Sequence, residues 1–274
     1  MIYFANKAVI VTGGASGLGK ALCMELGRRG AKVVVVDIDQ EGAEQVSVDI
    51  NRAGGESIYG YCDVTIYQNA LRIVKDVVRK FGKVDIVFNN AGTAIQGDAR
   101  DLTVEHWRNV IDINLMGVIY GAISAYEVMG RQGRGQIVNI GSLAGLIPIP
   151  NEIPYCTSKW AVVGFSHSLR EEGRDLGIKV NLVCPGLMHT AIYDKIPWVN
   201  VDRQKSMHIR MAHHFVAPER AAKIILHGVE RNKSMIIFPC YARLVWWVYR
   251  FMPVLFRLFF QKMVRDFRKT RIIQ

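Results

Sequence analysis

The sequence predicts an α/β fold: a Rossmann-type, doubly wound sheet of about seven parallel strands with helices on both faces. Short apolar runs alternate along the chain with longer segments of helical length and period. A glycine-rich turn follows the first apolar run, and 50% of the 274 residues are hydrophobic, which suffices for a large core. These three observations favour a folded nucleotide-binding architecture and exclude a mainly disordered chain.

The expected strands are apolar on both faces, as is typical of a covered parallel sheet. They are residues 8–12, 32–36, 57–61, 84–88, 136–140, 179–183 and 235–238, of which 57–61 is the weakest. The helices predicted between them are residues 18–29, 41–53, 66–81, 104–130, 155–176 and 218–232. Pro218 suits a first helical turn, where its missing N–H costs nothing. We therefore expect residues 1–240 to form a single domain, with a loop-rich substrate lid at about 187–216.

The glycine-rich turn at residues 12–19, Thr-Gly-Gly-Ala-Ser-Gly-Leu-Gly, is the first candidate ligand site. Glycines let the backbone approach a pyrophosphate, and a helix N-terminus offers free N–H groups and the positive end of a dipole. The residues expected at the cofactor are Gly13, Ala15, Ser16, Gly17, Leu18 and Gly19. Taken alone, such a motif could also be a tight strand–helix turn that binds no ligand.

Asp37 ends the second expected strand, 18 residues after Gly19. A carboxylate at this place can accept hydrogen bonds from the hydroxyls of an adenosine ribose. It would also repel a 2′-phosphate, and neither Ser16 nor Ile38 brings a positive charge to bind one. The expected cofactor is therefore NAD(H) rather than NADP(H), although Asp37 alone could be a carboxylate that merely begins a loop.

With the motifs that follow, the chain resembles the short-chain dehydrogenase/reductase family over about residues 5–240. The resemblance rests on the Thr-Gly-x-x-x-Gly-x-Gly turn at residues 12–19, on Asn-Asn-Ala-Gly at residues 89–92, on the Tyr-x-x-x-Lys spacing at 155–159 and on Pro-Gly at 185–186. It implies a cofactor site completed by Asp63, Val64, Asn90, Ala91, Gly92, Tyr155, Lys159, Pro185, Gly186, Met188 and Thr190.

Tyr155 and Lys159 are the centre of the expected catalytic site. They are four residues apart on a predicted helix, hence on one face. A nearby ammonium lowers the pKa of a phenol, which suits Tyr155 to general acid/base catalysis. Ser142 is expected to orient the substrate oxygen. The resemblance implies that Lys159 also binds the nicotinamide ribose and that Asn114 holds a water that links Lys159 to solvent. Taken singly, these residues could be a surface pair, a turn serine and a capping asparagine.

Two apolar segments, residues 143–150 and the stretch from 187, are expected to flank the nicotinamide. The pocket residues predicted from them are Ser142, Leu143, Ala144, Ile149, Tyr155, Leu187 and Ile192. They favour a lipophilic secondary alcohol or ketone, such as a steroid-like, long-chain or isoprenoid compound, although they could simply pack the lid. The alternatives are a 3-oxoacyl-thioester reductase and, in another class, a catalytically idle NAD(H)-binding sensor or membrane-surface scaffold.

Five cysteines, an odd and small number for this length, favour reduced thiols and a cytoplasmic location. No metal site is predicted, because the histidines lack paired cysteine or carboxylate motifs. No apolar run is long enough to predict a spanning helix, and the first residues do not resemble a signal peptide.

Residues 241–274 are expected to form a basic amphipathic helical tail, which carries +7 of the formal net charge of +11. Arg243, Arg250 and Arg257 recur every seven residues, hence on one helical stripe, and Pro253 is expected to split the tail into two helices. The tail could contact a membrane surface, cover the substrate pocket or pack against a neighbouring subunit. Nucleic-acid binding is not expected, because the basic residues lie among apolar ones. The resemblance implies a homodimer or homotetramer through helices 104–130 and 155–176.

Overall fold

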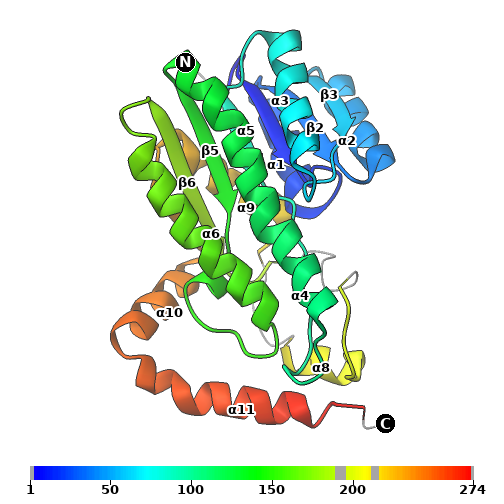
Figure 1. Ribbon diagram of the computed structural model, residues 1–274, viewed down its shortest axis with the longest axis vertical. Coiled ribbons are helices and arrows are strands. Elements are labelled where there is room, and N and C mark those ends of the chain that lie inside the picture. Colours follow the sequence, from blue (N-terminus) through cyan, green and yellow to red (C-terminus); the bar gives the residue numbers. More distant parts are fainter. Residues whose placement is uncertain (1–2, 189–195, 211–215, 273–274) are drawn as a thin grey trace.

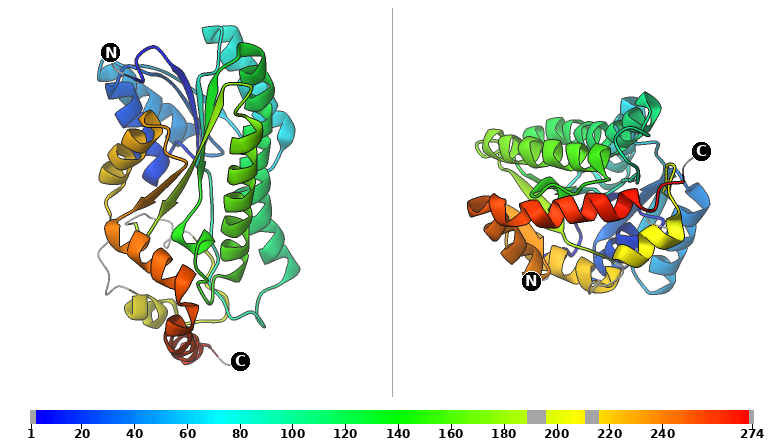
Figure 2. Two further views of the ribbon diagram at one scale, coloured as in Figure 1. Left: turned by 90° about the vertical axis from the view of Figure 1, so that its left-hand side faces the viewer. Right: turned by 90° about the horizontal axis from the view of Figure 1, so that it is seen from below.

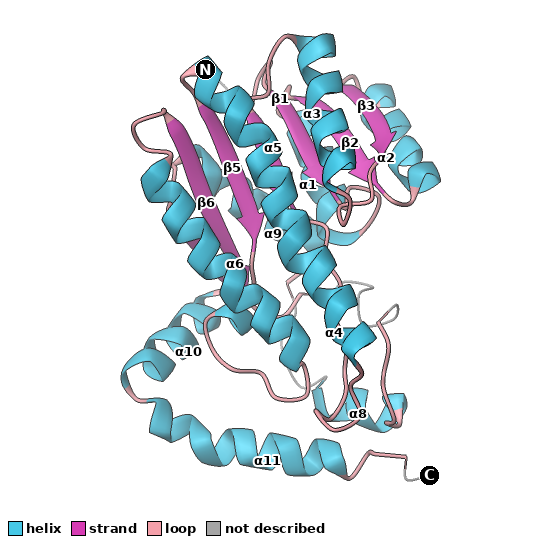
Figure 3. Cartoon of the chain, viewed as in Figure 1, coloured by secondary structure: helices cyan, strands magenta, loops and turns pink. Residues whose placement is uncertain are grey.

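The computed structural model describes residues 3–188, 196–210 and 216–272. Within these residues, seven parallel strands form one sheet in the order β3-β2-β1-β4-β5-β6-β7, which confirms the predicted fold class (Figures 1 and 3). The strands are β1 (Ala8–Thr12), β2 (Lys32–Asp37), β3 (Glu56–Tyr61), β4 (Ile86–Asn89), β5 (Gly135–Ile140), β6 (Ile178–Pro185) and β7 (Met235–Phe238). The strand order reverses between β1 and β4, the place where such sheets bind nucleotides.

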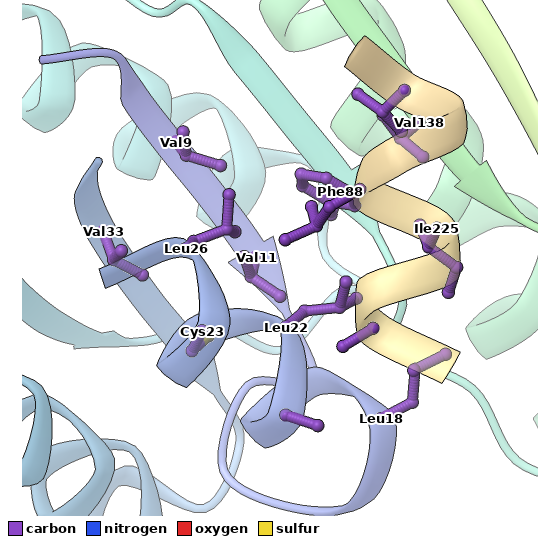
Figure 4. Close-up of a cluster of buried hydrophobic side chains, with 14 of the residues drawn as sticks. Val9, Val11, Leu18, Leu22, Cys23, Leu26, Val33, Phe88, Val138 and Ile225 are labelled. Atoms are coloured by element: carbon purple, nitrogen blue, oxygen red, sulfur yellow. The ribbon is translucent and has the colours of Figure 1, made fainter. Parts of the chain in front are cut away.

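Helices cover both faces of the sheet (Figure 2). One face carries α1 (Gly17–Arg28), α2 (Gln40–Arg52) and α9 (Pro218–Glu230), and the other carries α3 (Tyr67–Phe81), α5 (Gly117–Gln132) and α6 (Ile153–Glu172). Strand β2 shows why its sequence is apolar throughout: Val33 and Val35 enter one core, and Val34 and Val36 enter the other. In the first core, Leu22 of α1 and Ile225 of α9 gather around Val11 and Phe88 (Figure 4).

The helix predicted over residues 104–130 is interrupted. It consists of α4 (Val104–Ile111), a π-helical segment η1 (Asp112–Met116) and then α5. Its beginning is fixed by a capping box, in which Thr103 Oγ1 accepts from the His106 N–H and His106 Nδ1 accepts from the Thr103 N–H. π-helical segments occur frequently at functional sites, and this one carries Asn114.

The lid predicted as loop-rich contains a helix, α8 (Arg203–Arg210). Its first turn begins after Asp202, whose Oδ1 accepts a hydrogen bond of 3.1 Å from the Lys205 N–H. The segment therefore contains a helix as well as loop, because an aspartate in the capping position favours the start of a helix even where apolar periodicity is weak.

The tail forms α10 (Cys240–Phe251), a 3-10 turn η3 (Pro253–Phe256) and α11 (Arg257–Arg268), with the break directly before Pro253. Helix α11 lies across the end of the molecule toward which the carboxyl ends of the strands point (Figures 1 and 2). In the part of the chain that the structure describes, no helix combines the length and hydropathy needed to cross a membrane.

Candidate active site

The glycine-rich turn runs from β1 into α1 and is fastened to the end of β4. Thr12 Oγ1 accepts hydrogen bonds from the N–H groups of Asn90 (2.9 Å) and Ala91 (3.1 Å). Asn90 Nδ2 in turn donates to the carbonyl oxygens of Thr12 and Gly13. A Cβ at Gly19 would lie 1.9 Å from the Gly13 carbonyl oxygen, so this close approach requires glycine. The turn is thus a fixed cradle ahead of the N-terminus of α1.

Asp37 lies at the carboxyl end of β2, beside the glycine-rich turn. Its Oδ2 accepts a 3.0 Å hydrogen bond from the Ala15 N–H, and its Oδ1 accepts one from the Asp39 N–H. A carboxylate offers about four acceptor positions, so capacity remains for two ribose hydroxyls. Ile38 follows with 63% of its surface exposed. These groups fit the adenosine half of NAD(H), and they bring no cation to a 2′-phosphate.

Lys159 is the buried cation of the site. Only 4% of its surface is exposed, and its Nζ donates a 2.9 Å hydrogen bond to the Ile140 carbonyl oxygen at the end of β5. The ammonium lies 5.6 Å from the ring centroid of Tyr155, one turn earlier on α6. Burial lowers the pKa of Lys159 to about 8. An ammonium has three donors, so two remain beside the bond to Ile140.

Ser142 lies two residues after β5, at the start of a short 3-10 turn, η2 (Leu143–Gly145). Its Oγ accepts a 3.1 Å hydrogen bond from the Ala144 N–H, so its own hydrogen remains available to a substrate oxygen. A Cβ at Gly145 would lie 2.5 Å from the Lys159 carbonyl oxygen, which shows how closely η2 packs on α6. Ser142 is thereby held beside the helix that carries Tyr155 and Lys159.

Asn114 is fully buried in the π-helical segment and connects two parts of the site. Its Oδ1 accepts from the Thr93 N–H and its Nδ2 donates to the Thr93 carbonyl oxygen, both at 2.8 Å. The same Nδ2 donates to Ser158 Oγ on α6, at 3.1 Å. Asn114 therefore holds the loop after β4 against α6; its role in holding a water stays a prediction.

The other predicted residues lie at the same edge of the sheet. Asp63 and Val64 follow β3, where the Asp63 carboxylate accepts from Thr65, and Val64 packs against Gly117. Gly92 lies between Asn114 and Lys159, with a Cβ position 3.2 Å from Asn114 Oδ1. The remaining predicted residues lie in three segments at this edge. They are Gly13, Ala15, Ser16, Gly17 and Leu18 at the first turn, Leu143, Ala144 and Ile149 after β5, and Pro185, Gly186, Leu187 and Met188 at the end of β6 and beyond it. Thr190 and Ile192 lie outside the described residues.

Sequence reasoning missed a buried polar pair that joins the substrate-side segments. Gln96, after β4, donates from its side chain to the carboxylate of Glu152, and both residues are buried. The backbone of Gln96 also bonds to Pro197 and Val199, in the region predicted as the lid. No motif marks Gln96, because the pair depends on loops 56 residues apart coming together.

Cys184, which the sequence did not single out, lies beside Lys159. Burial raises the pKa of this thiol to about 12, and it accepts a hydrogen bond from the Ser142 N–H. All five cysteines are free. At neutral pH Cys184 is therefore a neutral packing partner rather than a nucleophile.

This geometry places a phenol, a buried ammonium and a serine hydroxyl at the carboxyl edge of a nucleotide-binding sheet, which suits proton transfer to or from a substrate oxygen. The family model described as short chain dehydrogenase matches residues 7–198. An uncharacterised oxidoreductase of Thermotoga maritima is 39% identical over 67% of this chain and 72% of its own length. Human 15-hydroxyprostaglandin dehydrogenase [NAD(+)] is 34% identical over 70% of this chain and 71% of its own length.

Among solved structures, a short-chain dehydrogenase/reductase from Burkholderia phymatum in complex with NAD superposes with a TM-score of 0.85 and 25% identity. The superposition covers 94% of this chain and 97% of that one. The motifs, the strand order and these similarities agree with one another. The chain is an oxidoreductase that belongs to the short-chain dehydrogenase/reductase family.

Proposed function

We propose that this protein oxidises a lipophilic secondary alcohol to the ketone, or catalyses the reverse reduction, with NAD(H) as its cofactor. The observation that carries the proposal is the placement of Tyr155, Lys159 and Ser142 at the edge where the glycine turn and Asp37 form a nucleotide cradle. The NAD-dependent enzyme named among the relatives supports the cofactor, and the hydroxyprostaglandin in its name supports a secondary alcohol as substrate.

When bound, NAD⁺ supplies the hydride-acceptor chemistry, and the chain itself binds, orients and exchanges a proton. The Asp37 carboxylate and the turn at residues 13–19 would hold the adenosine and pyrophosphate. Tyr155 Oη takes the proton of the alcohol, and the ammonium of Lys159 favours the phenolate form. Ser142 Oγ donates to the substrate oxygen and fixes its distance from Tyr155.

The substrate class rests on the apolar segments beside Ser142 and after β6. Leu143, Ala144, Ile149 and Leu187 lie there, and none of them offers a charge or a side-chain hydrogen bond to a polar substrate. Each apolar methylene that enters such an environment contributes about 0.8 kcal/mol. Polar or strongly anionic alcohols should therefore be poor substrates.

A series of 2-alkanols of increasing chain length tests this assignment. With NAD⁺ in excess, kcat/KM should rise about two- to fourfold for each added methylene until the pocket is filled. The rate is followed by NADH absorbance, with a charged 2-hydroxy acid of equal length as the control. A flat series, or a preference for the hydroxy acid, would contradict a lipophilic substrate.

The cofactor assignment predicts a strong preference for NAD⁺ over NADP⁺, of at least about tenfold in kcat/KM, because the Asp37 carboxylate would repel a 2′-phosphate. The Asp37→Asn variant keeps an oxygen for the Ala15 N–H but loses the charge, so its activity with NADP⁺ should rise relative to that with NAD⁺. Steady-state kinetics with both cofactors measure the ratio. Equal use of both cofactors by the unmodified protein would refute the role of Asp37.

A further inference from the structure

The two tail helices expose many large apolar side chains. We use the name tail surface for the exposed residues Leu244, Trp247, Phe251, Met252, Val254, Leu255, Leu258 and Phe259. Single apolar side chains on a surface are ordinary, whereas a continuous apolar region marks a place of interaction. Leu258 is 75% exposed and Val254 is 69% exposed, so the chain's own core does not cover this region.

Aromatic packing holds the two tail helices together. Tyr249 of α10 packs against Phe256 and Phe260, with ring centroids 5.7 and 6.3 Å apart, and thereby fixes α10 against α11. Phe267, further along α11, is buried. Phe260 also contacts Phe259 of the tail surface, with ring centroids 5.7 Å apart. The exposed apolar side chains are therefore part of a folded arrangement and not a frayed end.

The charge around the tail surface is mainly positive, and the one carboxylate near its far end, Asp266, is paired with Lys269. Its exposed cations are Arg243, Arg250, Arg257, Lys262 and Arg265, and no acidic residue occurs between Cys240 and Arg265. A second copy of the same surface would bring these five cations against five others, which opposes self-association. An apolar centre with a mainly cationic border instead complements an anionic lipid surface, where headgroups meet the arginines and acyl chains meet Trp, Phe and Leu.

The far end of the tail is fastened to the substrate side of the enzyme. Arg268 Nε bonds to the buried carboxylate of Asp98 at 2.8 Å, and Arg271 forms a two-pronged ion pair with Asp101. The guanidinium groups of Arg100 and Arg268 hold the pKa of Asp98 well below its usual range. Asp98 and Asp101 lie in the loop that also contains Gln96, so α11 and this loop form one connected structure.

The near end of the tail contacts the segment that follows β6. The Leu187 N–H donates to Tyr241 Oη at 3.0 Å, and a Cβ at Gly186 would lie 2.8 Å from the same oxygen. Both ends of the tail are therefore connected to segments of the candidate active site. In the right-hand view of Figure 2, α11 lies across this end of the molecule.

We propose that α10, η3 and α11 form a docking surface for a membrane of anionic phospholipid, with the substrate side of the enzyme facing the lipid. The eight apolar side chains of the tail surface enter the interface, and the arginines and Lys262 bind the headgroups. The ion pairs of Arg268 and Arg271 keep this surface in a fixed orientation to the active site.

Vesicle flotation with the full-length protein tests the docking surface. Binding to vesicles of phosphatidylcholine with phosphatidylserine should exceed binding to pure phosphatidylcholine at least about tenfold, and should weaken as salt is raised. Leu258→Asp should lower binding at least about tenfold. Leu176→Asp is the matched control, because Leu176 is also exposed but lies two residues before β6, at the opposite edge of the sheet.

A second pair of variants tests the charges. Arg250→Gln/Arg257→Gln should weaken binding by roughly 25-fold, at about fivefold for each arginine. Arg52→Gln/Arg79→Gln removes the same charge from α2 and α3 and should leave binding unchanged. The proposal is overturned if the unmodified protein does not float with anionic vesicles, or if all variants float equally. It is also overturned if Leu258→Asp instead dissociates an oligomer, as sedimentation velocity would show.

The orientation toward lipid rests on the proposed function and has its own readout. Leu258→Asp should lower turnover of a long-chain secondary alcohol carried in anionic vesicles, and should leave turnover of a short, water-soluble secondary alcohol unchanged. Flotation requires no turnover, so failure of the docking surface and failure of the dehydrogenase assignment give different results. Equal loss on both alcohols would contradict the proposed orientation.

Discussion

Replacing Tyr155 by Phe is expected to lower kcat by about 10²–10⁴, the usual contribution of a general acid/base, while NADH binding stays nearly unchanged. The substitution removes one oxygen from the first turn of α6 and leaves the ring in place beside Lys159. The alcohol proton then has no acceptor within the site. Initial rates of NADH formation measure turnover, and fluorescence titration measures NADH binding.

The control for this loss is Tyr59→Phe, which removes the same oxygen from an exposed residue of β3. Its turnover should equal that of the unmodified protein. Tyr155→Phe with more than a tenth of normal turnover would show that another group exchanges the proton. Loss of NADH binding together with turnover would instead show that Tyr155 serves mainly to hold the cofactor.

Replacing Lys159 by Met should abolish most turnover and should also change how stability depends on pH. Burial lowers the pKa of Lys159 from its ordinary 10.5 to about 8 in the folded protein. Below pH 8 the lysine is charged in both the folded and the unfolded state, so the full burial cost of about 3 kcal/mol applies. Between about pH 8 and 10.5, Lys159 has lost its proton in the folded protein but keeps it in the unfolded chain. The free-energy cost of burying the lysine therefore shrinks as pH rises.

Urea unfolding of the cofactor-free protein at pH 7 and pH 9.5 measures this effect. The quantity to compare is the difference in free energy of unfolding, Lys159→Met minus the unmodified protein. This difference should fall by about 2 kcal/mol from pH 7 to pH 9.5. In the variant the Ile140 carbonyl loses its hydrogen-bond donor, which costs about 1–3 kcal/mol of stability. Because this cost is the same at every pH, it cancels when the two pH values are compared. The exposed Lys80→Met should show no such slope, and a slope of zero for Lys159→Met would mean that this ammonium is not desolvated.

Much of the fold follows from the sequence because a covered parallel sheet imposes a simple pattern. Each strand must be apolar on both faces, as Val33–Val36 of β2 show, and each helix between strands must have a length that spans the sheet. The predicted strand ends differ from the observed ones by at most two residues. The π-helical segment was not predictable, because a shift of a few backbone hydrogen bonds leaves no trace in apolar periodicity.

The candidate site also has a part that the sequence predicts and a part that it does not. Residues fixed by local spacing, such as Tyr155 and Lys159 on one helix, could be predicted from the sequence. The contacts that give them their chemical environment come from distant segments: Lys159 donates to Ile140, and Asn114 joins Thr93 to Ser158. These bonds depend on how strands and loops pack, which no motif encodes.

The structure of the tail was predictable only in part from its amphipathic pattern. Its two helices and the break before Pro253 follow from proline chemistry and composition. The attachment of the tail to the rest of the enzyme does not follow from the sequence, because Arg268 and Arg271 bond to carboxylates 170 residues earlier in the chain. Membrane contact, coverage of the substrate pocket and packing against a neighbouring subunit were the alternatives for the sequence. The structure has bonds from the tail to the loop after β4 and an exposed apolar surface on the tail helices.

The most direct test of the proposed chemistry is the stoichiometry of products from NAD⁺ and a long-chain secondary alcohol. We predict equal amounts of NADH and ketone, formed at a steady rate by the unmodified protein and not by Tyr155→Phe. The opposite result would be an unmodified protein that binds NADH tightly but forms neither product from any alcohol in the series. That outcome would contradict a dehydrogenase and identify the chain as a nucleotide-binding protein without turnover.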